Sequence, residues 1–117
     1  KVELWGTGSP LREFLHVDDL AGACVMLLNL DNPPDLVNLG SGEEVTIAEL
    51  ANIVAETVGY RGEITRDLSK PDGTPRKLCD TSLLRSLGWK PKYDIRSGVA
   101  AAYKSFKEEL ASGKIRM

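Results

Sequence analysis

The sequence predicts an α/β fold with a small mixed sheet of short strands and three to four helices. Glycines and prolines divide the chain into short apolar runs that alternate with longer periodic ones, which is typical of this class. The 117 residues contain 42% hydrophobic and 27% charged side chains, an average composition for a soluble globular domain. This length fits one domain over residues 1–117. Too few strands are expected for a doubly wound sheet, which favours the smaller lobe of a two-domain protein.

The first third of the chain is expected to hold two extended segments and one helix. Residues 2–5 form a strand that ends in the turn Gly6-Thr7-Gly8-Ser9-Pro10, and residues 13–17 form a second extended run. The Asp18 carboxylate then caps a helix over residues 19–30. Because apolar side chains occur nearly all round this helix, we expect it to be deeply packed.

The middle of the chain contains the clearest helix signal. A short strand over residues 36–39 ends at the turn Gly40-Ser41-Gly42. Thr46 and Glu49 then have the spacing of a capping box, and the apolar positions that follow predict an amphipathic helix that ends at Gly59.

The remaining elements are a strand, a long loop and two helices. Residues 62–66 are expected to form the strand, and residues 67–77 form a polar loop rich in turn formers. Thr81 caps a short helix through Leu87, and Asp94 caps the last helix. The apolar positions of this last helix are Ile95, Val99, Ala102, Phe106 and Leu110.

Charge and cysteine content exclude several classes of function. The formal net charge is −2 with no block of one sign, so neither nucleic acid nor an anionic membrane is expected as a partner. The longest apolar stretch, residues 21–28, is too short to cross a bilayer. The two cysteines belong to no CxxC or Cys/His cluster, which favours a reducing, cytoplasmic compartment and predicts neither a disulfide framework nor a bound metal.

Two glycine-rich turns raise the question of a dinucleotide-binding loop. The turn at residues 6–10 is followed by Arg12-Glu13, not by a helix whose N-terminus could hold a pyrophosphate. The turn at residues 40–42 lacks the third glycine of the fingerprint and the acidic residue about 20 positions further on. Both are therefore interpreted as plain tight turns.

The single histidine and the two cysteines allow a catalytic and a structural interpretation. His16 precedes Asp18 and Asp19 and could act as a general base, but holding the entrance of a helix is the favoured role. Cys24 is expected to be an inert core residue. Cys79 follows Arg76-Lys77, which could lower its pKa, although a structural role is favoured because no base is adjacent.

The loop over residues 69–77 combines two prolines, an Asp-Gly turn and three cations. A stiffened loop of this kind suits a ligand with phosphates and hydroxyls, because little entropy is lost on binding. The other interpretation is a solvated surface loop, and the residues alone favour neither. Trp5 and Arg12 flank the first glycine turn, so they could meet one ligand. Alternatively, and favoured, Trp5 is a core residue and Arg12 a surface cation.

Several motifs together resemble the GDP-L-fucose synthases, which are extended short-chain dehydrogenase/reductases. The resemblance extends in order from the first residues to about Phe106. It is carried by the stretch from Leu4 to Ala21 around Arg12-Glu13-Phe14-Leu15-His16-Val17-Asp18-Asp19, the stretch from Val37 to Ile47, Lys70-Pro71-Asp72-Gly73-Thr74-Pro75-Arg76-Lys77, and Leu87-Gly88-Trp89.

This resemblance implies a C-terminal lobe that binds a GDP-sugar. It places Trp5 and Arg12 at substrate-binding positions, with Lys77 at a basic position of the same site. Arg12 is suited to a bidentate contact with the diphosphate, Lys77 supplies a point charge, and Trp5 supplies a flat apolar wall. Asp72 either accepts hydrogen bonds from sugar hydroxyls or shapes its turn.

The same resemblance implies what this chain lacks. The family's cofactor loop, its catalytic Ser and Tyr-x-x-x-Lys, and its epimerisation acid and base lie upstream of the matched stretch, so no catalytic or cofactor-binding residue is assigned here. Tyr103 and Lys107 have the Tyr-x-x-x-Lys spacing but lie on the last expected helix, and we interpret them as ordinary helix neighbours. The chain is thus expected to be the substrate lobe without its dehydrogenase half, either as a fragment or as a natural truncation.

Two hypotheses about function remain. The first is a GDP-sugar-binding lobe that is inactive alone, the intact enzyme converting GDP-4-keto-6-deoxymannose to GDP-L-fucose with NADPH. The second is a stand-alone interaction or assembly module that kept the fold. Separating the lobe from the dehydrogenase half should bare apolar surface, for which the first expected helix is the best candidate. We therefore expect a homo-oligomer, for example a domain-swapped dimer with its hinge in the loop at residues 31–35 or in the loop at residues 67–77.

Overall fold

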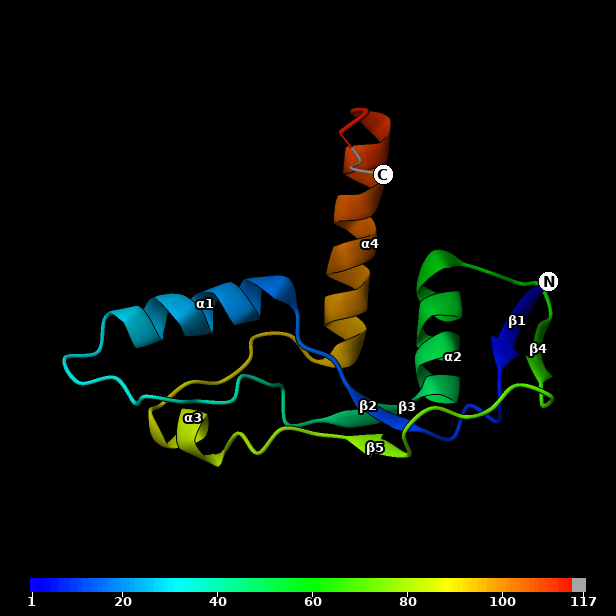
Figure 1. Ribbon diagram of the computed structural model, residues 1–117. Helices are drawn as coiled ribbons and strands as arrows, with labels where there is room; N and C mark the ends of the chain where they lie inside the picture. Colours follow the sequence, from blue (N-terminus) through cyan, green and yellow to red (C-terminus); the bar gives the residue numbers. More distant parts are fainter. Residues whose placement is uncertain (115–117) are drawn as a thin grey trace.

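The computed structural model describes residues 1–114. Within them the chain forms five short strands and four helices, which Figure 1 shows in sequence colours. In chain order these elements are β1 (Val2–Trp5), β2 (Leu11–Glu13), α1 (Val17–Leu28), β3 (Glu44–Thr46), α2 (Ile47–Val58), β4 (Ile64–Asp67), β5 (Arg76–Lys77), α3 (Ser82–Ser86) and α4 (Ile95–Ala111).

The strands form two small sheets. β1 pairs with β4 in parallel, while β2 lies between β3, to which it is antiparallel, and β5, to which it is parallel. The predicted α/β class, with short mixed strands and four helices, is confirmed.

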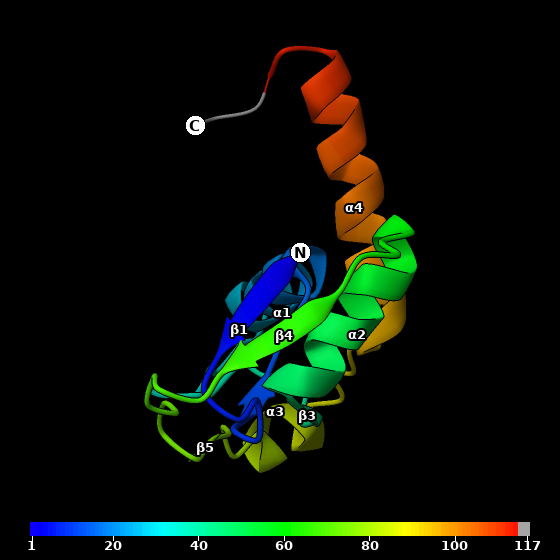
Figure 2. The ribbon, with the colours of Figure 1, turned by 90° about the vertical axis from the view of Figure 1, so that its right-hand side faces the viewer.

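Two connecting segments link these sheets. Residues 6–10 connect β1 to β2, and residues 68–75 connect β4 to β5. Because β1 is parallel to β4 and β2 is parallel to β5, both connectors run from the first sheet to the second in the same direction. Figures 1 and 2 show the two connectors as the irregular stretches between the sheets. We call them the paired connectors.

The predicted start and end of α2 and the predicted N-cap of α4 are confirmed. At α2, the Thr46 hydroxyl accepts a hydrogen bond from the Glu49 N–H at 3.1 Å, and the Glu49 carboxylate accepts one from the Thr46 N–H at 2.8 Å. Gly59 ends the helix in the left-handed region with a φ of 73°. At α4, Asp94 and Ser97 form a second reciprocal capping box.

The start of α1 differs from the expectation. The second strand lies at Leu11–Glu13 instead of residues 13–17, because pairing with β3 and β5 occurs there. The residue at the N-cap is His16, not Asp18, and its Nδ1 accepts a hydrogen bond from the Asp18 N–H at 3.2 Å. With an aspartate in its first turn, α1 still gains a favourable interaction with the helix dipole.

Two further expectations are wrong in detail. Residues 36–39 form no strand, because no strand of residues 1–114 lies alongside to supply hydrogen bonds. Instead, the side-chain amide of Asn38 donates a hydrogen bond to the Asp80 carbonyl. Thr81 occupies the N-cap position of α3 without a side-chain cap. The Asp80 carboxylate accepts the Ser82 N–H at 2.9 Å in its place.

The expectation that α1 is deeply packed is also wrong. Its buried side consists of Ala23, which joins Leu84 and Trp89 in the core, and of Asp19. The two Asp19 carboxylate oxygens accept hydrogen bonds from the backbone N–H groups of Lys92 and Tyr93, at 2.9 and 3.0 Å. These bonds attach α1 to the segment that precedes α4.

The opposite side of α1 is exposed to solvent. Val17 is 68% exposed and Leu28 is 84% exposed. Cys24 is exposed too, so the expectation that it is a core residue is wrong. Helix α1 therefore has two apolar sides, of which only one is covered.

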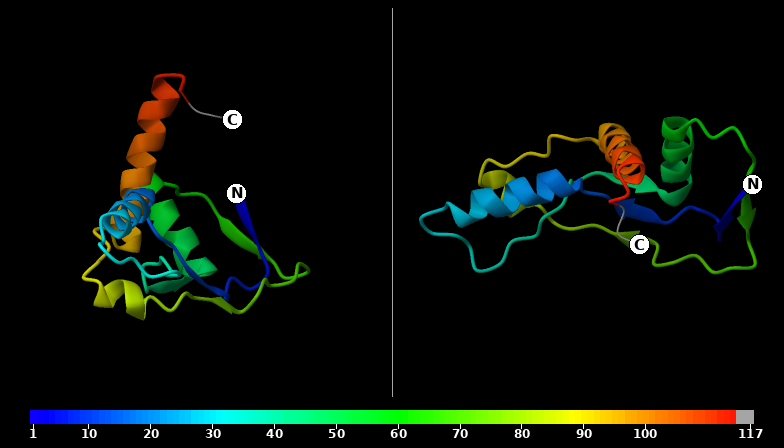
Figure 3. Two further views of the ribbon diagram at one scale, coloured as in Figure 1. Left: turned by 60° about the vertical axis from the view of Figure 1, so that its left-hand side comes forward. Right: turned by 90° about the horizontal axis from the view of Figure 1, so that it is seen from above.

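The molecule has an open outline. Its radius of gyration is 17.0 Å, whereas a compact chain of this length would have about 13 Å. Figure 3 shows α4 projecting from the body and α1 extending away from α2. Among the described residues, no helix is long and apolar enough to cross a membrane.

Candidate functional site

Trp5 is the last residue of β1 and borders the paired connectors. Its side chain is 69% exposed, so the interpretation of Trp5 as a core residue is wrong. The Lys70 ammonium lies over the indole, 5.6 Å from the ring centroid, which is a cation–π contact. The sequence does not mark Lys70 as a site residue, because there it is only one of three cations in a polar loop.

Asp72 joins the two connectors. One of its carboxylate oxygens accepts the Thr7 N–H at 2.8 Å, and the other accepts the Thr7 hydroxyl at 2.7 Å. These hydrogen bonds hold the pKa of the Asp72 carboxyl below its usual value, and the bond from the Thr7 hydroxyl has the larger effect. Gly6 has a φ of 73°, and a Cβ there would lie against the Asp72 carboxylate. Asp72 therefore fixes the turn at residues 6–10, while a contact of its carboxylate with sugar hydroxyls stays a prediction.

Arg12 and Lys77 are brought together by strand pairing. They lie opposite each other in the register of β2 and β5, so their side chains leave the sheet on the same face. The Arg12 Nη1 donates to the Leu11 carbonyl at 2.6 Å. Its Nη2 lies so near Gly73 that a Cβ at that glycine would be 3.1 Å away. The Arg12 side chain therefore lies against the connector formed by residues 68–75.

Arg76 points to the other face of the same sheet. Its guanidinium donates two hydrogen bonds from Nε and Nη2 to the Glu44 carboxylate, the shorter at 2.6 Å. This pairing lowers the pKa of the Glu44 carboxyl and raises that of Arg76. Of the adjacent basic pair, Lys77 therefore shares a face with Arg12, while Arg76 is occupied by Glu44.

Carboxylates from this chain occupy both glycine turns. Asp72 fills the approach to the turn at residues 6–10, as described above. At the turn of residues 40–42, the Glu13 carboxylate accepts the Gly42 N–H at 2.6 Å and lies where a Cβ of Gly40 would be. A pyrophosphate at either turn would meet a negative charge, which supports the interpretation of both as structural turns.

The remaining candidates have structural surroundings. His16 caps α1, lies 3.8 Å from the Asp18 carboxylate and stacks on Tyr93 with ring centroids 4.1 Å apart. This geometry supports the favoured structural role. Cys79 is exposed, and its backbone N–H donates to Glu13 at 3.3 Å.

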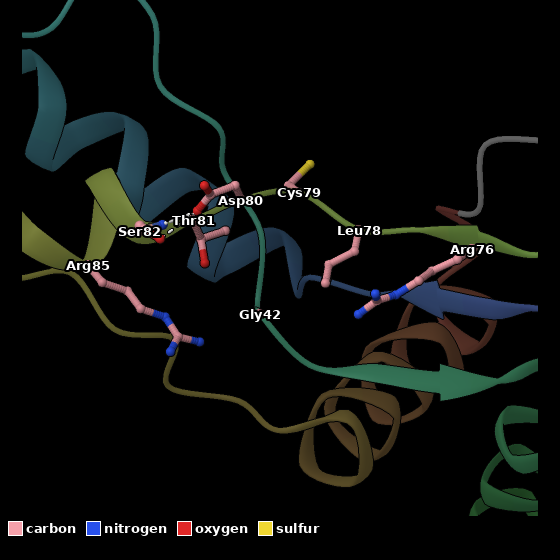
Figure 4. A pocket seen from close by; sticks show the side chains of 8 residues that line it. All are labelled: Gly42, Arg76, Leu78, Cys79, Asp80, Thr81, Ser82 and Arg85. Atoms are coloured by element: carbon pink, nitrogen blue, oxygen red, sulfur yellow. Dashed lines mark hydrogen bonds between the residues drawn. The ribbon is translucent and has the colours of Figure 1, made fainter.

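A separate cavity of about 550 Å³ lies beside α3, and Figure 4 shows the side chains around it. Arg85 reaches across it toward Gly42, with its Nη2 3.4 Å from the Ser41 carbonyl. The other basic residue here is Arg76, already paired with Glu44. Arg12 and Lys77 do not line this cavity, and Arg76, which does, leaves the sheet on the face opposite to theirs.

Comparison with known proteins shows which protein family this chain resembles. The sequence model of the NAD dependent epimerase/dehydratase family matches residues 1–40. GDP-L-fucose synthase 1 from Arabidopsis thaliana is 60% identical over 103 residues, which cover 88% of this chain and 32% of that protein. The chain belongs to this epimerase/dehydratase family. GDP-L-fucose synthase from Escherichia coli is 45% identical over 116 residues, covering 92% of this chain and 36% of the relative.

Solved structures of the family have the same fold. The NADP-bound GDP-mannoheptose C4 reductase MlghC from Campylobacter jejuni superposes with a TM-score of 0.77 and 37% identity. The match covers 90% of this chain and 34% of the reductase. The chain spans about a third of the length of the relatives that it matches.

Proposed function

We propose that this chain binds the nucleoside diphosphate part of a GDP-sugar at the paired connectors. The observation that carries the proposal is the pairing of Arg12 with Lys77 on one sheet face, next to connectors fixed by Asp72. Relatives named as GDP-L-fucose synthases support the choice of sugar nucleotide. In the intact relatives the activity would be the conversion of GDP-4-keto-6-deoxymannose to GDP-L-fucose with NADPH.

Each residue of the proposed site has a distinct part. Arg12 places a planar guanidinium on one phosphate, and Lys77 adds a second positive charge from the neighbouring strand. The exposed indole of Trp5 forms an apolar wall for a base or sugar ring. Asp72 acts through the connectors, since its carboxylate already accepts both hydrogen bonds from Thr7. Fixing the connectors before binding reduces the entropy that the ligand must overcome.

We further propose that the chain alone has no turnover and binds no NADP(H). The pair Tyr103 and Lys107 has the spacing of the family's catalytic pair, but the Lys107 ammonium lies 4.6 Å from the ring centroid of Tyr103, over the ring itself. Both residues lie on α4, which follows no strand directly. Nicotinamide fluorescence that changed at micromolar protein, or formation of GDP-L-fucose by the pure chain, would contradict this statement.

Calorimetric titration with GDP tests the proposed site. We expect binding to weaken about 10- to 100-fold in Arg12→Ala, because a hydrogen bond to a charged group contributes about 1.5–3 kcal/mol. Lys77→Ala should weaken it less, because an ammonium makes a less directional contact. Arg61→Ala, an exposed cation between α2 and β4, is the matched control and should bind as the unchanged chain does. Equal affinity of all three variants, or no binding at millimolar GDP, would reject the proposal.

The second candidate function is a non-enzymatic assembly module. The specific observation that favours it is the uncovered apolar side of α1, on which Val17 and Leu28 are largely exposed. If the chain serves only assembly, light scattering should show a mass above 12.8 kDa at micromolar concentration while GDP has no effect. A GDP-binding chain whose affinity depends on Arg12 would reject this alternative.

A further inference from the structure

The cavity beside α3 is lined largely by polar groups, and several of them already have partners within the chain. Arg76 donates two hydrogen bonds to the Glu44 carboxylate. Ser82 donates its hydroxyl and its backbone N–H to the Oδ1 atom of Asp80. These two bonds lower the pKa of the Asp80 carboxyl, which is therefore charged at neutral pH. The capacity of Arg76 and Ser82 to donate hydrogen bonds to a ligand is thus largely used.

Arg85 differs from these residues, because its guanidinium forms no ion pair within residues 1–114. Figure 4 shows its side chain extended across the cavity toward Gly42. The hydrogen bond from its Nη2 to the Ser41 carbonyl is 3.4 Å long, beyond the roughly 2.7–3.2 Å of an ordinary N–H···O bond. Since a guanidinium carries five N–H donors, most of the donor capacity of Arg85 is left for a ligand.

Thr81 supplies a second donor to the same cavity. The residue is only 7% exposed and occupies the N-cap position of α3. A threonine at this position ordinarily accepts a backbone N–H of the helix, but the Thr81 hydroxyl makes no capping bond. Burying a hydroxyl is favourable only where it finds a hydrogen-bond partner, so a polar group in the cavity would stabilise it.

Arg85 and Thr81 converge on one point beside Gly42. A Cβ at this glycine would meet the Arg85 Nη2 and would lie 3.4 Å from the Thr81 Oγ1. Gly42 has a φ of 77°, which favours glycine, so this space stays open. The Glu13 carboxylate accepts the Gly42 N–H at 2.6 Å and holds the adjacent wall in place. A wall fixed before binding reduces the entropy that a ligand must overcome.

We propose that the cavity beside α3 is a second binding site, which takes a small hydroxycarboxylic acid with its carboxylate on the Arg85 guanidinium and the Thr81 hydroxyl. Two parallel N–H donors of a guanidinium match the two oxygens of a carboxylate. The Oδ2 atom of Asp80 can accept a hydrogen bond from a hydroxyl of the same molecule, because Ser82 uses only Oδ1.

The charge and the size of the cavity support this class of ligand. The negative charge of Asp80 on its lining disfavours a doubly charged phosphate more than a singly charged carboxylate. A volume of about 550 Å³ lies within the range of small-molecule sites, roughly 300–1,000 Å³. Neither Arg12 nor Lys77 lines the cavity, so this site does not depend on the proposed binding of GDP.

Nuclear magnetic resonance titration of the chain with D-gluconate tests the site without GDP. Gluconate carries one carboxylate and several hydroxyls, and sorbitol, which has the hydroxyls alone, is the matched control ligand. We expect gluconate to shift the amide signals of Gly42 and Thr81 and the Nε–H signal of Arg85 in a saturable way. Sorbitol, and sodium chloride at the same ionic strength, should leave these signals in place, and inorganic phosphate should bind more weakly than gluconate.

Substitutions identify the two donors. Arg85→Lys keeps the charge but removes the planar fork, and Thr81→Val keeps the shape but removes the hydroxyl. We expect each to weaken gluconate binding about 10-fold, because a hydrogen bond to a charged group contributes about 1.5–3 kcal/mol. Thr81→Ser restores the hydroxyl and should restore binding. Arg61→Lys, at an exposed cation between α2 and β4, is the control and should bind as the unchanged chain does. Circular dichroism verifies that each variant folds.

Four results would overturn the proposal. Two concern the ligands: the absence of saturable shifts at Gly42, Thr81 and Arg85, and the same shifts with sorbitol. The third is equal gluconate affinity of Arg85→Lys and Arg61→Lys. The fourth is tighter binding of inorganic phosphate than of gluconate, which would assign the cavity to a phosphate instead of a carboxylate.

Discussion

Helices α1 and α2 are both twelve residues long, yet they relate to the rest of the chain in different ways. α2 begins with a reciprocal capping box, ends at a left-handed glycine, and packs against α4 and β3. α1 is capped by a histidine, has no left-handed glycine at its end, and leaves one apolar side in solvent. Local sequence signals therefore define where a helix forms, whereas coverage of its apolar side depends on polypeptide elsewhere.

The attachment of α1 provides the largest expected effect. Asp19→Ala removes the buried carboxylate that accepts the N–H groups of Lys92 and Tyr93, and it leaves both donors without their partner. Since a hydrogen bond to a charged group contributes about 1.5–3 kcal/mol, we expect the free energy of unfolding to fall by about 3 kcal/mol. Urea denaturation followed by circular dichroism measures this change.

Asp18→Ala is the matched control for that measurement. Its side chain is 74% exposed, and removing it should lower the free energy of unfolding by less than about 1 kcal/mol, the loss of a helix-dipole interaction. Equal effects of the two substitutions would show that α1 is not held through Asp19, and the contrast with α2 would then need another basis.

Two glycine substitutions sharpen the comparison because their expected signs are opposite. Gly59→Ala at the end of α2 forces a side chain into a backbone with a φ of 73°, and we expect a loss of about 1 kcal/mol. Gly22→Ala within α1 meets no atom within 4 Å and improves helix propensity, so a gain of about 0.5–1 kcal/mol is expected. Thermal unfolding of the two variants in parallel measures both changes. A loss at Gly22 would indicate that the surface of α1 around this residue is in close contact in solution.

The same division separates what the sequence predicts from what it misses. The capping box at Thr46 and the cap at Asp94 are confirmed, because each depends on residues only three apart. The strand expected over residues 36–39 fails since a strand requires a partner, and none of the described strands lies beside it. β5 is two residues long and is defined only by its pairing with β2, which no local pattern indicates.

The candidate site follows the same rule. The family resemblance predicts Trp5, Arg12, Asp72 and Lys77 as site residues, and their binding roles stay predictions. The contacts that organise them join distant residues: Thr7 with Asp72, and Lys70 with Trp5. Chemistry-bearing residue types can be recognised in a sequence, but contacts across more than 60 positions require the fold.

The smallest expected effect is the acid titration of the α2 capping box, a feature that the start of α1 lacks. Hydrogen bonds from the Thr46 backbone and hydroxyl lower the pKa of the Glu49 carboxyl. A carboxyl with a lowered pKa in the folded state stabilises that state above the unfolded pKa, about 4.3 for glutamate, and the stabilisation is lost as the pH falls through the folded value. At neutral pH the box is therefore fully formed.

Nuclear magnetic resonance of the Thr46 amide measures this titration. Its proton donates to Glu49 at 2.8 Å, so we expect its chemical shift to change on acidification with a midpoint below about 4.3. Glu49→Gln keeps a hydrogen-bond acceptor but removes the ionisable group, and it should abolish the titration while leaving the helix formed. A midpoint at or above the ordinary glutamate value, or a shift that persists in Glu49→Gln, would show that the carboxylate does not close the box in solution. The start of α2 would then resemble that of α1, and the difference between the two helices would reduce to which of them is covered.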